Sequence, residues 1–516
     1  MPSTPPDRPP SRPAAPTAGG PGAADQVVRR VVAALLCGVL ALVAAGCSDG
    51  APSSVAQGAA TTEPTSGPAT SAEDAAAASG TAEDAAPGAV VGGTDVPDVS
   101  GVRVPRDLAR TLARLLTRRS AAVLAGDRDA FLADVGDGLA ASQGAYFDNL
   151  AQLPLAELTY RLDRRSLVRD GDDHWVVVEV STRLAGYDVA AVRTFDRLRF
   201  SPTPGGRQVL TSTSDAAWEA ENRVGSQPWD LEPVTVRDVD GVLAVLDAGT
   251  AGQADRLLRV VEAARDDVRS RFPDWDGRVV VYLLGDDAFL DGLTGVPGGD
   301  ADALDGLTVS VPTGPVDASG TPAVASRRVL LQPRVLGESV VTRGRLVRHE
   351  LVHVAVGERD TGAPVWLTEG LAEWTSVQAL PPTRRTVPEE ALDAARDGIE
   401  GMPADAVFHD APEVDYALAW WTCEYVAATY GPTAPWTLLD EVTAGVAAGE
   451  DPDDVVGRVL GLSTDQLARR GARLMLTTYD PAAVATESPD TDEPVSPDTS
   501  RVPDGEPTTT AEATGG

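Results

Sequence analysis

The stretch Arg348-His349-Glu350-Leu351-Val352-His353 carries the strongest structural signal in this chain. Its two histidines are four residues apart, so on a helix both imidazoles lie on one face, one turn from each other. The glutamate follows the first histidine directly. This His-Glu-x-x-His arrangement supplies two metal ligands and a general base. The flanking run 340–356 contains no Pro and stops at Gly357, which predicts a helix over these residues.

A second stretch, Trp366-Leu367-Thr368-Glu369-Gly370-Leu371-Ala372-Glu373, supplies what the first one lacks. A catalytic zinc site needs a third protein ligand and an open coordination position. We expect a helix from near Thr368, on which Glu369 and Glu373 are four residues apart and both face the first helix. Glu369 would join the two histidines in binding one Zn²⁺ ion per chain. Glu373 would accept a hydrogen bond from a ligand histidine.

Together the two stretches resemble the gluzincin metallopeptidases, and the second resembles the bacterial peptidase MA-like group. The resemblance covers roughly residues 250–478. It implies a mainly helical, zincin-like peptidase domain with a small sheet. In that superfamily the glutamate before the glycine is the third zinc ligand. Carried over to this chain, the resemblance implies the metal ligands His349, His353 and Glu369, with Glu350 as the general base.

This resemblance implies hydrolysis of peptide bonds in a peptide or protein substrate. Zinc lowers the pKa of a bound water towards neutrality, and Glu350 would take its proton and pass it to the leaving amine. In the family, a tyrosine at the start of a later helix hydrogen-bonds the developing oxyanion. Tyr416 matches that position, because it begins a predicted helix over 416–430. His409 either shares this role or is a surface residue.

Residues 1–46 are expected to form a disordered leader and a lipoprotein signal peptide. Arg29-Arg30 precede an apolar run, residues 31–45, which is too short for a comfortable membrane span but suits a signal-peptide core. The run leads into Ala44-Ala45-Gly46-Cys47, which resembles a bacterial lipobox and implies cleavage before Cys47 and lipid attachment to it. The alternative is an uncleaved anchor. Both place the rest of the chain outside the cytoplasmic membrane, anchored to its outer face.

Two acidic segments of low complexity flank the region that is expected to fold. Residues 47–100, a predicted disordered tether, contain eight acidic residues and no arginine. Residues 479–516, a predicted disordered tail, contain nine acidic residues and one arginine. Neither segment has the apolar residues to bury a core. They contribute about half of the formal net charge of −34, and this acidity argues against a nucleic-acid partner.

Residues 101–232 are predicted to form a small α+β domain, and the whole chain is expected to belong to the α+β class. Leucines from Leu108 to Leu116 recur at helical spacing, and Asp127 opens a second predicted helix. Strands are predicted at 158–162, 175–180 and 193–200, where apolar and polar residues tend to alternate. Helices followed by a curved antiparallel sheet resemble nuclear-transport-factor-2-like domains. Such folds often enclose a pocket, but no reactive set of residues is evident here.

The predicted second domain, 250–478, is joined to the first by expected strands at 229–231 and 234–245. A buried strand is predicted at 278–284, followed by a Gly- and Asp-rich loop to about residue 306. The strand at 327–332 has two interpretations: an edge strand that pairs with extended substrate, or a purely structural strand. Scaffold helices are predicted at 433–447, 451–461 and 463–477.

Two alternatives compete with a peptidase. In the first, the histidines and acids lie on a solvated helix face without a metal, which leaves the second stretch unexplained. In the other, the chain is a surface lipoprotein that binds a ligand or a cell-wall component and carries an inactive zincin-like domain. Glu350 disfavours this second alternative, because a structural zinc site has no use for a base. Structural sites also tend to close their fourth position with Cys or His.

Overall fold

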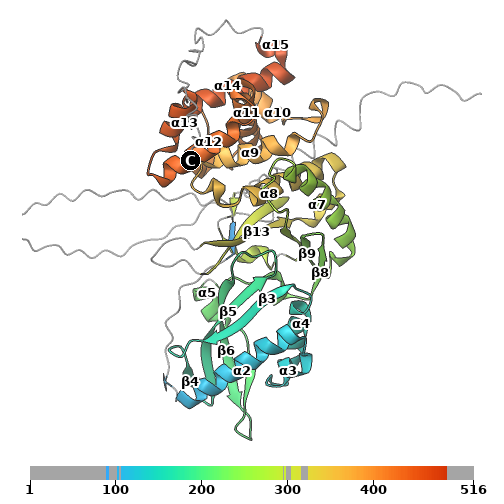
Figure 1. Cartoon of the computed structure of the whole chain (residues 1–516), viewed down its shortest axis with the longest axis vertical. Coiled ribbons are helices and arrows are strands. Elements are labelled where there is room, and N and C mark those ends of the chain that lie inside the picture. Colours follow the sequence, from blue (N-terminus) through green and yellow to red (C-terminus); the bar gives the residue numbers. More distant parts are fainter. Residues whose placement is uncertain are drawn as a thin grey trace, which may run out of the picture.

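The computed structural model describes residues 89–91, 102–103 and 106–484, apart from 223, 287, 295, 298–303 and 315–322. Three parts are stacked along its long axis: an N-terminal unit of helices and one sheet, a second sheet, and a group of helices (Figure 1). This mixture of helices and sheets confirms the α+β class. The predicted signal peptide with Cys47, and residues 485–516 of the predicted tail, lie outside the described residues.

The N-terminal unit is an antiparallel sheet with helices packed on it. Helices α2 (Arg106–Ala125) and α3 (Arg128–Leu132) were predicted, whereas α4 (Ala140–Leu150) was not. Asp127 caps α3 by accepting a hydrogen bond from Ala130 N. The strand order is β2-β4-β5-β6-β7, with β3 also paired to β5. The strands are β2 (Val102–Arg103), β3 (Leu155–Leu162), β4 (Val168–Asp170), β5 (Asp173–Leu184), β6 (Val192–Pro202) and β7 (Gln208–Ser212).

The second sheet has the strand order β11-β1-β12-β13-β10-β9-β8. Helices α7 (Ala254–Arg269) and α8 (Val340–Val356) pack on one face. Side chains alternate along β9: Val242, Ala244 and Leu246 belong to the core with these helices, whereas Leu243 and Val245 belong to the core of the N-terminal unit. Burial on both faces explains the continuous apolar runs. The strands are β1 (Ala89–Val91), β8 (Val234–Val239), β9 (Val242–Asp247), β10 (Val279–Leu283), β11 (Leu293–Thr294), β12 (Gly306–Pro312) and β13 (Val324–Leu331).

One strand prediction is wrong, and one of the two interpretations of the strand at 327–332 is contradicted. Residues 229–231 belong to a short helix, α6 (Pro228–Leu231), because Pro228 has the backbone angle that suits the first helical position. The segment 327–332 is no edge strand: β13 is paired with β12 on one side and β10 on the other. Its backbone groups are therefore engaged within the sheet, and it cannot pair with an extended substrate. The strand β12, which pairs with one side of β13, was not predicted. It begins where the predicted Gly- and Asp-rich loop ends.

Three segments differ in extent from the sequence-based division into domains. β8 and β9 precede the expected start at residue 250, yet they lie in the same sheet as β10. Ala89–Val91, within the predicted tether, forms a strand that runs parallel to β12 and antiparallel to β11. At the other end, α14 (Thr464–Tyr479) and α15 (Pro481–Val484) extend past the expected boundary at 479.

The remaining helices form a cluster around α11 (Pro412–Tyr430). The predicted scaffold helices are present, and α8 has the predicted bounds. Gly370 lets α9 (Val365–Val377) approach α11 closely, because a Cβ at this position would lie 2.6 Å from the carbonyl oxygen of Ala419. None of the helices in the described part is both long and apolar enough to cross a membrane. The other helices of the cluster are α10 (Glu389–Asp397), α12 (Ala434–Ala447) and α13 (Pro452–Leu460).

Candidate metal centre

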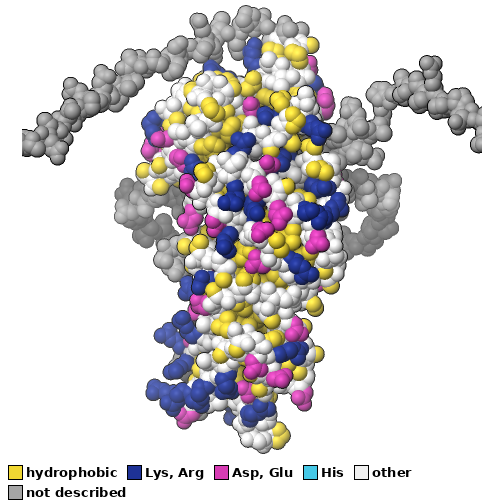
Figure 2. All heavy atoms as spheres, turned by 45° about the vertical axis from the view of Figure 1, so that its right-hand side comes forward, with side chains coloured by type: hydrophobic (Ala, Val, Ile, Leu, Met, Phe, Trp, Pro, Cys, Tyr) yellow, Lys and Arg dark blue, Asp and Glu magenta, His cyan; other side chains and the backbone are white. Residues whose placement is uncertain are grey.

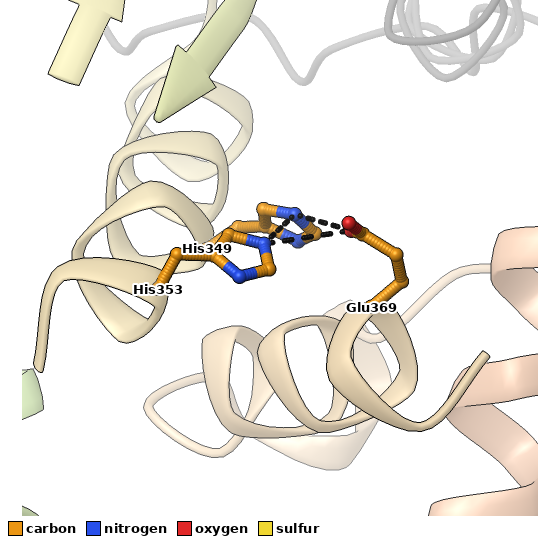
Figure 3. A group of neighbouring side chains, drawn as sticks. All are labelled: His349, His353 and Glu369. Carbon is orange, nitrogen blue, oxygen red and sulfur yellow. Dashed lines mark hydrogen bonds and ion pairs between the residues drawn. The ribbon is translucent and has the colours of Figure 1, made fainter. Parts of the chain in front are cut away.

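Helices α8 and α9 lie side by side and bring three possible metal ligands together (Figure 3). The Nε2 atoms of His349 and His353 are 3.2 Å apart. Oε2 of Glu369 lies 3.1 Å from Nε2 of His349 and 3.5 Å from Nε2 of His353. The four-residue spacing on α8 places both imidazoles on the face towards α9. The helix α9 begins at Val365, after Pro364, and this places Glu369 in its second turn.

These three side chains have the geometry to hold a metal ion. Ligand atoms about 2.0–2.1 Å from a tetrahedral zinc ion lie roughly 3.3 Å from each other. The three observed separations, 3.1, 3.2 and 3.5 Å, bracket that value. Two imidazole nitrogens and one carboxylate oxygen are also a donor set that suits zinc while leaving a fourth position open. The residues present therefore fit this metal.

The Glu373 carboxylate lies next to the His349 ring. Its Oε1 lies 3.2 Å from Nδ1 of His349, on the side of the ring away from Glu369. Its other oxygen accepts two hydrogen bonds from the guanidinium of Arg345, one of them at 3.1 Å from Nε. The Arg345 guanidinium in turn lies 4.9 Å from the ring centre of Trp420, on α11. Nδ1 of His349 is thus within ion-pair distance of Glu373 but outside hydrogen-bonding geometry, and Nε2 is the nitrogen that faces Glu369 and His353.

The electrostatics of the site favour a positive charge between α8 and α9. Burial would raise the pKa of Glu369, but His353 and His349 hold it well below its usual range. Burial likewise opposes ionisation of Glu373, yet Arg345 and His349 hold its pKa at about 2. For His349, burial opposes the charged form, and the two glutamates raise its pKa well above the ordinary value. Two ionised carboxylates around buried imidazoles stabilise a cation, either a proton or a metal ion.

Glu350 points from α8 towards β12 and contacts residues that the sequence analysis did not single out. The hydroxyl of Thr308 donates a hydrogen bond to Oε2 of Glu350, with an oxygen–oxygen distance of 2.8 Å. Gly306 leaves room for the same carboxylate, because a Cβ there would lie 3.1 Å from Oε1. Burial raises the pKa of Glu350, while His349 and His353 counteract this.

Arg327 of β13 is a further residue that the sequence analysis missed. Its Nη1 donates to the carbonyl oxygen of His353 at 3.0 Å. Both terminal nitrogens also bind the carboxylate of Asp360, at 2.9 and 2.7 Å. A bidentate pair of this kind is strongly oriented. Arg327 therefore links the last turn of α8 to β13 through the backbone of His353 itself.

Tyr416 and His409, the two candidates for stabilising an oxyanion, lie next to each other. The Tyr416 hydroxyl and Nδ1 of His409 are 3.3 Å apart. The ring centre of Tyr416 lies 6.2 Å from that of His349, which places the phenol beside the metal ligands. Burial, with Glu369 and Glu350 nearby, raises the pKa of Tyr416 well above its usual value. The phenol therefore keeps its proton and remains a hydrogen-bond donor.

The site combines three candidate metal ligands, a buried carboxylate and a phenol on one side of the second sheet. The structure brings together every candidate site residue of the sequence analysis except Cys47, which lies outside the described residues. No protein-family model matches the chain, and no curated protein sequence matches it.

Proposed function

We propose that this protein is a zinc-dependent metallopeptidase that acts outside the cytoplasmic membrane and is anchored to it through lipidated Cys47. The observation that carries the proposal is the set of three donor atoms on His349, His353 and Glu369, which lie 3.1–3.5 Å apart. A buried carboxylate, Glu350, adjoins them, and it has no part in binding the metal. This combination favours a hydrolase over a structural metal site.

His349, His353 and Glu369 would hold the metal. Zinc, when bound, supplies a Lewis acid that makes a water molecule acidic near neutral pH and polarises the scissile carbonyl. Glu373 and Arg345 contribute by fixing the His349 ring through contacts at 3.2 and 3.1 Å. Such supporting contacts raise the affinity of a site for its metal.

The proton transfers fall to Glu350. Its carboxylate accepts a proton from the attacking water and delivers it to the nitrogen of the leaving amine, as a general base and then a general acid. The hydrogen bond from Thr308 holds one of its oxygens, and the other remains available for the proton. Tyr416, oriented by His409, donates a hydrogen bond to the oxygen that becomes negative when the carbonyl is attacked.

We extend the proposal to the two domains of the chain. The second sheet with α7 to α14 would be the zincin-like peptidase domain, and the N-terminal unit a domain of the nuclear-transport-factor-2-like type. What supports the latter is the order of three helices followed by an antiparallel sheet. A peptide or protein is the expected substrate, and the acidic chain is not expected to bind nucleic acid.

The test uses the chain from Ser48 onward and compares three substitutions. Wild type should contain about one zinc ion per chain and should cleave members of a fluorescence-quenched peptide library. Glu350→Gln should keep the zinc and lose activity by about 10²-fold or more. His349→Ala should lose the zinc. His174→Ala is the control, because His174 lies in β5 of the N-terminal unit, away from the site.

Unchanged hydrolysis in Glu350→Gln would refute the mechanism. Wild-type protein that takes up no zinc from added ZnCl₂ would refute the metal site.

A further inference from the structure

A cavity of about 490 Å³ lies in the N-terminal unit, between the sheet and its helices. Its walls come from α2, α4, β3, β5, β6 and the segment around α6. Ligand sites in proteins have volumes of roughly 300–1,000 Å³. Asn149 of α4 helps to close the cavity by donating to the carbonyl oxygen of Trp229 in α6, at 2.9 Å. The cavity is therefore framed by hydrogen-bonded elements of the fold.

Two arginines line the cavity. Arg328 is already bonded to Asp188, Gln227 and Tyr282, so the positive pole open to a ligand is Arg119. Many arginine side chains of the N-terminal unit lie on its surface (Figure 2). Arg119 differs from them, because its side chain is buried and only 4% exposed. Its guanidinium lies 3.7 Å from the ring centre of Phe131 and donates through Nη2 to Gln143. Nη1 has no partner in hydrogen-bonding geometry within the described part of the chain. A buried guanidinium with an unused donor is costly unless an acceptor is supplied.

Carboxylates give the same cavity a negative pole. Asp196 of β6 and Asp230 of α6 both line it. Asp196 is half-buried and Asp230 is exposed at the rim of the cavity. Desolvation raises the pKa of Asp196 to about 7, with contributions from Asp230 and Glu219 that outweigh the opposing effect of Arg119. Asp230 accepts a hydrogen bond from Gln227 N at 2.8 Å, but the Asp196 side chain has no hydrogen bond among the residues described. Neither acid forms an ion pair with Arg119, so the two poles do not neutralise each other directly.

The walls of the cavity also carry aromatic and aliphatic side chains beside the polar ones. The hydroxyls of Tyr146 and Tyr160 are 3.5 Å apart, and both side chains line the cavity. Trp229, Leu184 and Leu198 line it as well. Such walls suit an apolar or partly apolar body, while the hydroxyls offer further hydrogen bonds.

We propose that this cavity binds a small zwitterion of the size of an amino acid or a short peptide. The ligand's carboxylate contacts Arg119, and its ammonium group contacts Asp196 and Asp230. A purely anionic ligand would leave the acids unpaired, and a purely cationic ligand would leave Arg119 unpaired. A zwitterion supplies an acceptor for the free Nη1 and a donor for the carboxylates in one molecule.

This site is separate from the metal centre. The metal ligands and Glu350 lie on α8 and α9, and neither helix contributes to the walls of the cavity. The proposal therefore does not depend on peptidase activity.

The test is isothermal titration calorimetry of the chain from Ser48 onward with L-alanyl-L-leucine. Two blocked forms delete one pole of the probe each: the N-acetyl dipeptide lacks the ammonium, and the C-terminal amide lacks the carboxylate. We expect the free dipeptide to bind and each blocked form to bind at least about tenfold more weakly. Binding should be tighter at pH 8 than at pH 5, because Asp196, with a pKa of about 7, is ionised only at the higher pH.

Matched variants identify the site. Arg119→Met should weaken binding of the free dipeptide to the level of its amide. Arg118→Met should leave binding unchanged, since Arg118 is an exposed neighbour on α2. Asp196→Asn should weaken binding of the free dipeptide to the level of its acetylated form. Because Asn has the shape of Asp, this variant still tests the site if Arg119→Met does not fold. Asp148→Asn, on the surface of α4, is its control. No binding at about 10 mM dipeptide, equal binding of the blocked forms, or binding unchanged in the cavity variants would overturn the proposal.

Discussion

The hydroxyl of Thr308 lies 2.8 Å from Oε2 of Glu350 and 3.1 Å from the carbonyl oxygen of the same residue. The contact joins β12 to α8 across 42 positions of sequence. Both side chains are buried, so water does not compete for the hydrogen bond. A strand that carries no metal ligand thereby orients the carboxylate proposed to move protons.

Replacing Thr308 by Val tests this relationship, because Val keeps the shape of the side chain and removes the donor. A hydrogen bond to a charged group contributes about 1.5–3 kcal/mol, so we expect kcat to fall by about tenfold or more. Zinc content should not change, since Thr308 contacts no metal ligand. Thr308→Ser, which retains the hydroxyl, should recover most of the activity. Equal rates for the Val and Ser variants would show that the hydroxyl does not orient Glu350.

Glu373→Gln should weaken metal binding by about 10- to 100-fold. The amide is neutral, so it no longer balances Arg345 or supports His349 as a charged acceptor. Competition with a chromogenic chelator measures the affinity directly. Glu441→Gln, an exposed glutamate near Arg458, is the control and should bind zinc like wild type. An unchanged affinity in Glu373→Gln would mean that the carboxylate does not support the ligand.

A buried ion pair joins the N-terminal unit to the second sheet. Arg328 of β13 is 2% exposed and binds Asp188 Oδ1 at 2.9 Å, Gln227 Oε1 at 2.8 Å and the Tyr282 hydroxyl at 2.6 Å. Arg328→Met leaves Asp188 buried without its partner. Such changes destabilise proteins by about 3–5 kcal/mol, so the midpoint of urea unfolding should fall clearly.

Two comparisons complete that test. Arg259→Met, an exposed arginine on α7, should leave the urea midpoint within error. The double variant Arg328→Met/Asp188→Asn removes the unpaired charge and should recover part of the loss. If the double variant is no more stable than Arg328→Met, the cost comes from packing and not from the buried charge.

The raised pKa of Asp196 predicts a pH-dependent stability. Its folded pKa of about 7 lies above the unfolded value, so protonation stabilises the fold. This stabilisation is complete below about pH 4 and is lost as the pH rises to about 7. Asp196→Asn mimics the protonated form. It should therefore match wild type at pH 4 and exceed it at pH 8, by about 1–3 kcal/mol.

Thermal unfolding at both pH values measures this difference. Asp230, Glu219 and Arg119 face Asp196 and are present in both proteins, so they cancel to first order in the comparison. Asp148→Asn, on the exposed face of α4, should give no pH-dependent difference from wild type. A constant difference between Asp196→Asn and wild type across the range would contradict the raised pKa.

Local signals were sufficient for α8, the helix that carries the two histidines. The bounds of α8 follow from Ser339, whose side chain caps the first turn, and from Gly357, which ends the helix with a positive φ of 59°. The four-residue spacings then decide which side chains share a face of α8 and of α9. The three candidate ligands and Glu373 could be named for this reason, because their relative placement needs only helical geometry and the packing of two consecutive helices.

Long-range pairing decided what the sequence missed. Whether β13 is an edge strand depends on its pairing with β12. In β12, Leu307, Val309 and Val311 alternate with Gly, Thr and Ser, directly after a Gly- and Asp-rich stretch that resembles a loop. The expected strand at 229–231 became a helix because Pro228 starts it. Thr308 and Arg327 carry no motif, and only the packing of β12 and β13 against α8 gives them a role. Arg345 lies on α8 and gains its role from Glu373 of α9.

The sequence by itself thus determined the helices that carry the candidate ligands and the spacing of those ligands, since periodicity and capping act within one or two turns of chain. The tertiary structure alone decided the contact between Thr308 and Glu350, the support of His349 by Arg345 through Glu373, and the cavity between Arg119 and Asp196. These depend on residues far apart in sequence. Their proximity results from burial of apolar faces over whole sheets and helices, which no local pattern encodes.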